Sequence, residues 1–285
     1  MRESNDEDGT HMKLDQALEM VSETDVGMVR SHNEDALATE ASLGLVLIAD
    51  GMGGFRAGEV ASGMATSVIV SEMKAVLDKH VSFGSDPQTG QSEAQKLLRH
   101  CIARAHASIH QISRSQPQYS GMGTTLVAAL FHDNKMTVAH IGDSRLYRLR
   151  GDDFEQLTKD HSLVQEQLDL GMITPEQARL STNKSLVTRA LGIEATVEPE
   201  FHDYATDEGD IYLLCSDGLS DMVSDEDIGM TLRRSAADIG LCARQLVRMA
   251  NDNGGRDNVS LILVRVLSEY TAAHRFVDKV FGWLR

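Results

Sequence analysis

Four aspartates stand at the ends of apolar runs, where their carboxylates could do chemistry. Asp50 closes the run LVLIAD and Asp217 follows IYLLCS, and each is followed at once by a glycine. Asp143 comes after VAHIG, and Asp257 precedes VSLILV. A continuous apolar run of about four to eight residues predicts a buried strand. A carboxylate at the end of such a strand must be solvated, paired or bound to a metal ion, because burying it alone is prohibitive.

These carboxylates could hold metal ions if the fold brings them together. Two of them ~4 Å apart repel by about 4 kcal/mol at an effective dielectric constant near 20, so several stay ionised only with cations between them. Oxygen ligands without Cys or His favour Mg²⁺ or Mn²⁺ over zinc. A pair of such ions about 3.5–4 Å apart is a common device for hydrolysing phosphate esters. Each Asp-Gly taken singly is better explained as a turn that closes its strand, so the metal-site hypothesis depends on convergence.

The surrounding sequence predicts an α+β fold in which helices pack on sheets. Residues 159–186 lack strand character and are interpreted as short helices, one of them starting at Thr174–Pro175. Longer helices are predicted at 56–78, 93–115 and 225–251. Strands are predicted at 19–27, 36–39, 43–50, 124–131, 135–142, 144–151, 211–216 and 259–266.

The two ends of the chain differ from this central part. Residues 1–13 are polar and acidic, which predicts a disordered leader. We expect one domain at 14–268 and an amphipathic helix at 269–285, which carries an apolar stripe beside basic residues. This last helix could pack on the domain, or it could dock on a partner or a membrane surface. The stripe consists of Phe276, Val277, Val280, Phe281 and Leu284.

Composition excludes several classes of function. The chain of 285 residues has 27 Lys and Arg against 43 Asp and Glu, a net charge of −16, which argues against nucleic-acid binding. No run approaches the ~18 apolar residues of a membrane span, and the acidic start is not a secretory signal. The three cysteines, Cys101, Cys215 and Cys242, are odd in number and widely spaced. They predict neither a disulfide framework nor a zinc site, and we expect a cytoplasmic protein.

Six short motifs resemble those of the metal-dependent serine/threonine protein phosphatases of the 2C type, the PPM family, and its bacterial members in particular. They occur in the family's order over about residues 30–260. The resemblance implies a four-layer α-β-β-α sandwich of two antiparallel sheets flanked by helix pairs. The motifs are Arg30-Ser-His-Asn-Glu34-Asp35, Asp50-Gly51-Met-Gly-Gly54, Gly121-Met-Gly-Thr-Thr125, Gly142-Asp143-Ser-Arg145, Ser216-Asp217-Gly218 and Asp257-Asn258.

The resemblance also implies roles for the acidic residues. Asp50 would bridge two Mn²⁺ or Mg²⁺ ions, and the Gly51 carbonyl would bind one of them. Asp217 and Asp257 would complete the other ion's ligand set.

Four further side chains would surround these ions, according to the same resemblance. Glu34 and Asp35 would act nearby, partly through bound waters. Asp143, together with Asp217, matches the position of a third, weaker metal in bacterial relatives. Arg30 would grip the substrate phosphate, which suits a planar donor fork.

The implied activity is hydrolysis of phosphoserine and phosphothreonine in proteins. A hydroxide bridging the metals would attack phosphorus directly, without a phosphoenzyme, beside a mobile flap at about 160–185. Phosphorylated proteins are the expected substrates, and an opposing Ser/Thr kinase is the expected signalling partner. The alternative is a catalytically weak binding module. Members of that kind lose metal aspartates, whereas Asp50, Asp217 and Asp257 are all present.

Three further features of the sequence bear on the phosphatase interpretation. Many relatives have a histidine at the position of Met52 or Phe55, so the general acid is open, with His32 or a metal-bound water as candidates. Cys242 and Arg248 match the C-x5-R spacing of cysteine-dependent phosphatases, but the intervening ARQLV favours a helix over a phosphate loop. His161, near the flap, either touches substrate or has a structural role.

Overall fold

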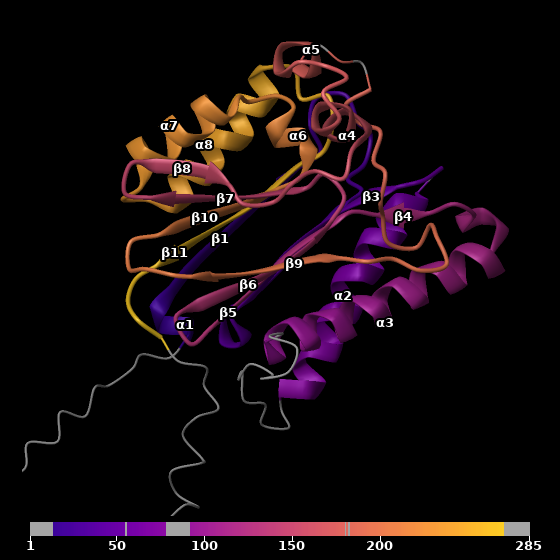
Figure 1. The fold of residues 1–285 in the computed structure, drawn as a ribbon, viewed down its shortest axis with the longest axis horizontal. Helices are drawn as coiled ribbons and strands as arrows, with labels where there is room; N and C mark the ends of the chain where they lie inside the picture. The colour runs from indigo at the N-terminus through magenta and orange to yellow at the C-terminus, as the bar shows by residue number, and fades with distance from the viewer. Residues whose placement is uncertain (1–13, 55, 78–91, 180, 182, 271–285) are drawn as a thin grey trace, which may run out of the picture.

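The computed structural model describes residues 14–270 except 55, 78–91, 180 and 182 (Figure 1). The predicted leader at 1–13 therefore lies outside the described residues. The predicted terminal helix at 269–285 does so too, apart from residues 269 and 270. None of the helices in the described part is both long enough and apolar enough to cross a membrane.

Eleven strands of the described chain form two sheets in which every pairing is antiparallel. The order in the first sheet is β1 (Leu18–Asp25), β11 (Val259–Val266), β10 (Ile211–Cys215), β7 (Arg145–Arg150) and β8 (Asp153–Gln156). The order in the second is β2 (Asp35–Glu40), β3 (Leu45–Met52), β5 (Leu126–His132), β6 (Lys135–Ile141) and β9 (Glu200–Ala205), with β4 (Gly123–Thr124) beside β3.

The central strands are buried on both faces, and their alternation divides the core into layers. On β3, Val46 and Ile48 pack between the sheets with Leu214 and Ile262 of the first sheet. The intervening residues of β3, among them Leu47, face the helices on the other side. Side chains of a strand alternate between its two faces, so an uninterrupted apolar run is what a doubly covered strand requires.

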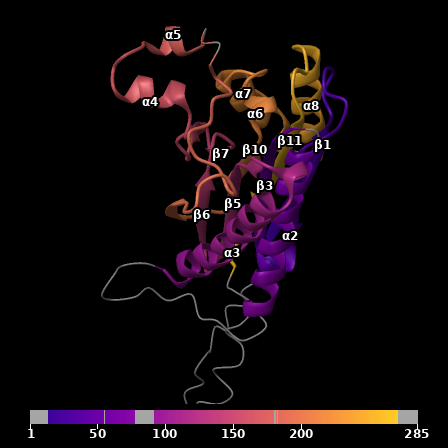
Figure 2. The same cartoon turned by 90° about the vertical axis from the view of Figure 1, so that its right-hand side faces the viewer.

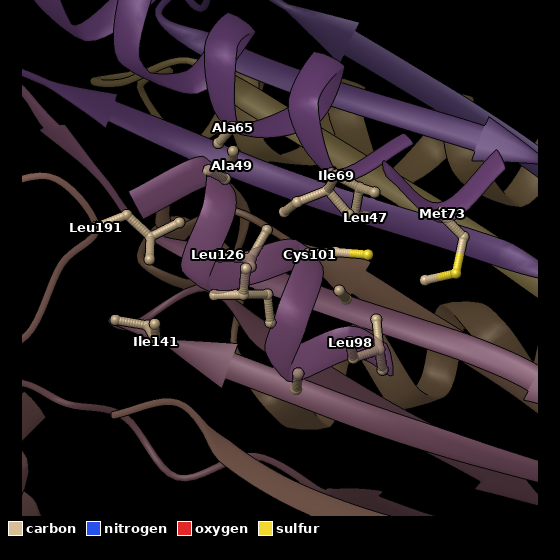
Figure 3. Packing of buried hydrophobic residues seen from close by; sticks show 14 of the residues in the cluster. Leu47, Ala49, Ala65, Ile69, Met73, Leu98, Cys101, Leu126, Ile141 and Leu191 are labelled. Carbon is tan, nitrogen blue, oxygen red and sulfur yellow. The ribbon is translucent and has the colours of Figure 1, made fainter. Parts of the chain in front are cut away.

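Two pairs of helices cover the outer faces of the sheets (Figures 1 and 2). Helices α2 (Ala57–Leu77) and α3 (Glu93–Ser115) pack on the second sheet, and Figure 3 shows Ile69 of α2 and Cys101 of α3 meeting Leu47. Helices α7 (Asp225–Ser235) and α8 (Ile239–Asp252) pack on the first sheet. The predicted four-layer sandwich is confirmed.

Several short helices complete the described chain. At one end of the sheets lie α4 (Leu163–Asp169), α5 (Pro175–Arg179) and α6 (Asp217–Ser220), and α4 and α5 project from the body of the molecule (Figure 2). The segment from 163 to 186 is closed at its base, where Ser162 pairs with Val187. The remaining short elements are α1 (Leu14–Ala17) and the 3-10 turns Ala41–Leu43 and Pro117–Tyr119.

Two strands, β8 and β9, are not predicted from the sequence because they are polar edge strands. In β8 three of the four residues are exposed. In β9 only Glu200, Phe201 and Tyr204 are partly covered, and no residue is fully buried. An edge strand is covered on few sides, so neither a continuous apolar run nor a clean alternation is needed to hold it. The sequence pattern that identified the central strands is therefore missing from both.

Candidate active site

The predicted carboxylates lie at one end of the two sheets. Asp35 and Asp50 stand directly opposite each other where β2 pairs with β3. In the first sheet, Asp217 follows the end of β10 and Asp257 stands two residues before β11, its antiparallel neighbour. The end of one strand and the start of an antiparallel neighbour share one edge of a sheet. Each sheet therefore contributes two of the aspartates.

Ser216 joins the two sheets at this point. Its hydroxyl donates a hydrogen bond of 2.9 Å to Oδ2 of Asp35. The Ser216 hydroxyl oxygen in turn accepts a hydrogen bond of 3.1 Å from the backbone N–H of Ser260. Asp35 belongs to the second sheet, whereas Ser260 belongs to β11 of the first and Ser216 directly follows β10 of the first. No role for Ser216 is predicted from the sequence, although its place directly before Asp217 in the Ser-Asp-Gly motif could have indicated one.

Asn258 holds the loop that carries Arg30 and Glu34. Its side-chain oxygen accepts from the backbone N–H of Glu34 at 2.8 Å, and its amide donates to the carbonyl of His32 at 3.0 Å. The neighbouring Asp257 accepts from Nη2 of Arg30 at 2.6 Å. This ion pair raises the pKa of Arg30, chiefly through the hydrogen bond. The motif pair Asp257-Asn258 thus positions both Arg30 and Glu34.

Thr124 and Thr125 fix the strand end that carries Asp50. The backbone N–H of Asp50 donates to Oγ1 of Thr125 at 3.1 Å, and the Asp50 carbonyl accepts from Oγ1 of Thr124 at 2.8 Å. Oγ1 of Thr125 lies 2.8 Å from Oγ of Ser144, next to Asp143. The Gly-Met-Gly-Thr-Thr motif, which had no role assigned from the sequence, therefore fixes the backbone around Asp50 and contacts the motif that carries Asp143.

Burial dominates the electrostatics of the cluster. It raises the pKa of Asp217 to about 6, with a further contribution from the charge of Asp257. Burial raises the pKa of Asp35 to about 7, although hydrogen bonds from serines partly oppose it. The pKa of Asp50 is raised well above its usual range by burial and then by the charges of Asp35 and Asp217. The pKa of Asp143 is also raised well above its usual range, first by burial and then by nearby charges, chiefly that of Asp217.

The cluster has the properties of a site for hard divalent cations. Three buried carboxylate oxygens, Oε1 of Glu34, Oδ1 of Asp35 and Oδ1 of Asp217, form no hydrogen bond within the described part of the chain. Buried polar atoms in proteins are nearly always satisfied, so these oxygens point to a ligand. All of the clustered donors are oxygens, which suits Mg²⁺ or Mn²⁺. The residues present therefore fit the divalent ions that the sequence predicts.

Binding of Mn²⁺ to the metal-free protein should release protons. Near pH 6 the raised pKa values leave Asp35 largely protonated and Asp217 partly so. Burial also raises the pKa of Asp50, and a metal ligand must be deprotonated. The apparent affinity should therefore rise between about pH 5 and pH 8. Calorimetric titrations in two buffers of different ionisation enthalpy count the protons released. Heats that do not depend on the buffer would contradict the assignment, and Asp35→Asn should release fewer protons than the parent.

Three other candidate side chains from the sequence, His32, Cys242 and Arg248, lie in different surroundings. Nε2 of His32 is 3.5 Å from Oε1 of Glu34, so this residue lies at the rim of the cluster. Cys242 is buried in α8, and burial raises the pKa of its thiol to about 11. Arg248 extends from the same helix with 82% of its side chain exposed. The C-x5-R segment is a helix, as the sequence analysis expects, and not a phosphate loop.

Among the described residues, His140, His161 and Glu200 form a group of candidate metal ligands, with ligand atoms within 4.8 Å of one another. The hydrogen bonds nevertheless place a proton on Nε2 of both rings. Nδ1 of His161 accepts from the backbone N–H of Gly142 at 3.1 Å, so its Nε2 donates to Glu200 at 3.0 Å. Nε2 of His140 faces the carbonyl of Lys159 at 2.9 Å and must donate to it. We interpret this group as a hydrogen-bonded network.

His161 therefore has the structural role that the sequence left open. Its backbone N–H donates to the carbonyl of Gly142 at 2.9 Å, and its carbonyl accepts from the N–H of Thr188 at 2.8 Å. Together with the side-chain bonds to Gly142 and Glu200, these contacts join both ends of the α4–α5 segment to the loop that precedes Asp143. Only 6% of the His161 side chain is exposed, which leaves little surface for a substrate.

A cavity of about 550 Å³ opens beside the carboxylates. Asp143 and Asp217 line it, together with residues of the α4–α5 segment, of α6 and the turn after it, and of the start of α7. Its volume lies within the range of ligand pockets, about 300–1,000 Å³. The carboxylate cluster is therefore accessible from a space large enough for part of a protein substrate.

Comparison with known proteins places the chain among phosphatases. The family model described as "Protein phosphatase 2C" matches residues 29–257. The protein phosphatase PhpP of Streptococcus pneumoniae is 37% identical over 251 residues, which cover 86% of this chain and 96% of PhpP. The serine/threonine protein phosphatase PstP of Mycobacterium tuberculosis is 40% identical over 88% of this chain, and the match spans 45% of PstP.

Solved structures agree with these matches. The catalytic domain of PstP, solved with two manganese ions, superposes with a TM-score of 0.75 at 38% identity, covering 88% of this chain and 99% of that one. The serine/threonine phosphatase Stp1 from Staphylococcus aureus gives a TM-score of 0.78 at 33% identity, covering 90% of this chain and 98% of that one.

Proposed function

The chain belongs to the protein phosphatase 2C family and is a metal-dependent serine/threonine protein phosphatase, and we propose that its strand-end carboxylates are the metal ligands. Phosphorylated proteins are its substrates. The observation that carries the proposal is the group of buried carboxylate oxygens without hydrogen bonds at the end of both sheets. The PstP catalytic domain holds two manganese ions, and Mn²⁺ or Mg²⁺ suits the oxygens present here.

The ligand set that we propose follows the arrangement of the strands. Asp50, opposite Asp35 and beside Asp217, is the residue that would be shared by two ions. Asp217 and Asp257 would complete one ion's set, and the carbonyl of Gly51 the other. The remaining ligands that we propose are Glu34 and Asp35, partly through water, and Asp143 with Asp217 for a third ion.

The bound ions would supply a nucleophile at neutral pH and stabilise the charge on the phosphoryl oxygens. Arg30 would hold the substrate phosphate. Its side chain is 49% exposed, and Nη2 is anchored by Asp257. Within the described part of the chain this guanidinium forms no other hydrogen bond, so the rest of its planar fork can bind two phosphate oxygens. Asp257 thus orients Arg30 toward the cluster.

Removal and return of the metal tests the proposed function. We expect metal-stripped protein to release no phosphate from a phosphothreonine peptide, and added Mn²⁺ to restore release, because the uncompensated carboxylates repel both the substrate phosphate and each other. Phosphate release is followed colorimetrically, and circular dichroism confirms that the stripped protein stays folded. A folded protein that is inactive with every divalent ion would instead favour the binding-module alternative.

We also propose a partner, a cellular location and domain limits for this protein, which are consistent with its family. An opposing Ser/Thr kinase would supply the phosphorylated proteins. A reducing cytoplasm would suit the three cysteines, which are all free and buried. The catalytic domain would span 14–268, with the flap at about 160–185 and the terminal helix at 269–285 as an accessory that packs on it or docks a partner or membrane.

A further inference from the structure

We propose that the cavity between the flap and α6–α7 binds a cationic side chain of the substrate, so that the enzyme prefers phosphorylated sites flanked by Arg or Lys. This inference rests on the proposed function, because it takes the carboxylate cluster as the place where the phosphate binds. The lining of the cavity includes Asp143 and Asp217 of that cluster. Chain on either side of a bound phosphoresidue would therefore enter it.

The charges that line the cavity beyond the metal ligands are mainly negative. Four carboxylates, Asp160, Asp221, Asp225 and Glu226, stand against two cations, Arg145 and Lys184, among the described lining residues. Arg145 is already neutralised, because its Nε and Nη2 donate to both oxygens of Asp160 at 2.7 to 3.1 Å. The accessible charge is thus left to Asp221, Asp225 and Glu226, with Lys184 as the only opposing group in that set.

The acidic residues differ in how firmly they are held by other groups. Oδ1 of Asp225 accepts from the hydroxyl of Tyr147 at 2.9 Å and lies 3.7 Å from Arg145. Lys184 is close enough to Asp221 to stabilise its charge. Glu226 is exposed in the first turn of α7, and no hydrogen bond or ion pair is recorded for it in the described structure. Glu226 is therefore the carboxylate best placed to pair with an incoming cation.

Apolar residues in the same walls favour a long cationic side chain over a small ion. The flap contributes Val164, Leu168 and Ala178, and the opposite wall contributes Met222 and Val223. Lys and Arg bury their methylene stems on apolar surface while the charged head stays beside polar groups. A cavity with apolar walls and carboxylates at its rim matches this amphipathic shape. It repels an acidic side chain through the same charges.

The test compares phosphothreonine peptides that share one sequence and differ only in two flanking arginines or two flanking glutamates. With Mn²⁺-loaded enzyme at low salt, we expect kcat/KM for the arginine peptide to exceed that for the glutamate peptide about tenfold, since each exposed ion pair contributes up to a factor of about five. The ratio should shrink as salt is added. Equal values for the two peptides would overturn the proposal.

Three single-charge variants identify the source of the preference. Glu226→Gln should lower the ratio about two- to threefold, and Lys184→Gln should raise it by a similar factor, each through loss of one charge in the cavity. The matched control is Glu208→Gln, which removes the same charge from the exposed turn between β9 and β10, at the end of β10 opposite Asp217. A control that shifts the ratio as much as Glu226→Gln would attribute the preference to the overall charge of −16 and overturn the proposal.

Binding of unphosphorylated peptides separates this inference from the proposed function. Fluorescence anisotropy with the same arginine and glutamate flanks reads the charge preference without hydrolysis. If no peptide loses phosphate but the arginine peptide binds more tightly, and Glu226→Gln reduces that difference, the cavity assignment stands while the proposed chemistry fails. If peptides lose phosphate without any charge preference in either measurement, the chemistry stands and the cavity assignment is wrong.

Discussion

Replacing Asp217 by asparagine is expected to lower kcat/KM on a phosphothreonine peptide by about a thousandfold, or about 4 kcal/mol of transition-state stabilisation. The amide keeps the size of the side chain but loses the charge. It therefore weakens metal binding at this position, where Asp217 lies close enough to Asp50, Asp257 and Asp143 to interact with their charges. Steady-state kinetics at saturating Mn²⁺ measures the effect.

A matched substitution shows whether the loss is specific. Asp152→Asn makes the same chemical change in the exposed turn between β7 and β8, and that turn lies at the end of β7 opposite Asp143 and Arg145. We expect this control to keep the parent's kcat/KM within a factor of two or so, since isolated surface charges contribute little. An Asp217→Asn enzyme with near-parental activity would remove this residue from the proposed centre.

The same Asp217→Asn change should stabilise the metal-free protein at neutral pH. Burial raises the pKa of Asp217 to about 6 from 3.8, so the folded state binds more protons than the unfolded state between those values. Stability contributed by this group is therefore present below about pH 4 and is lost as the pH rises through about 6. Asparagine avoids that loss. Thermal unfolding should show a higher Tm for the variant at pH 8, and a much smaller difference near pH 4.

Gly51→Ala is expected to destabilise the fold by about 3 kcal/mol or more, because no space exists for the added methyl group. A Cβ at this position would lie 2.2 Å from the carbonyl oxygen of Gly58 and 2.6 Å from that of Glu34. The first belongs to the start of α2 and the second to the segment before β2, so backbone would have to move on two sides. Urea unfolding of the metal-free protein measures the cost without any contribution from metal binding.

Gly54 provides the control within the same motif. A Cβ there would have no atom within 4 Å, and its φ is not positive. Gly54→Ala should therefore change the stability by no more than about 0.5 kcal/mol. Equal destabilisation by the two substitutions would show that the motif needs glycine for backbone freedom and not for the close approach of α2 to β3.

Much of the fold was predictable because its central strands and long helices are specified locally. β3 and β11 are buried on both faces, and this environment requires the apolar runs that the sequence shows. α3 carries its buried residues at helical spacing and begins at Ser92, whose side chain accepts from the N–H of Gln95. Such signals depend on neighbours within one helical turn or one strand, so a single sequence contains them.

The supporting contacts of the candidate site were not predictable in the same way. Ser216 reaches Asp35 across 181 residues of chain, and Asn258 holds Glu34 across 224. The proton positions on His140 and His161 depend on Lys159 and Gly142, which approach only after β6, β7 and the base of the flap have packed. The acidic cavity likewise combines the flap with α7. Pairings at such separations leave no local pattern.

The sequence by itself determined which residues end the buried strands in a carboxylate, because a buried apolar run cannot continue through an unpaired charge. Only the tertiary structure decided that Asp35 and Asp50 of one sheet meet Asp217 and Asp257 of the other. That meeting depends on strand order, register and the packing of the sheets through Val46, Ile48 and Ile262. Strand order, register and sheet packing each depend on many contacts between residues far apart in the chain. The convergence on which the chemistry depends therefore exists only in the folded protein.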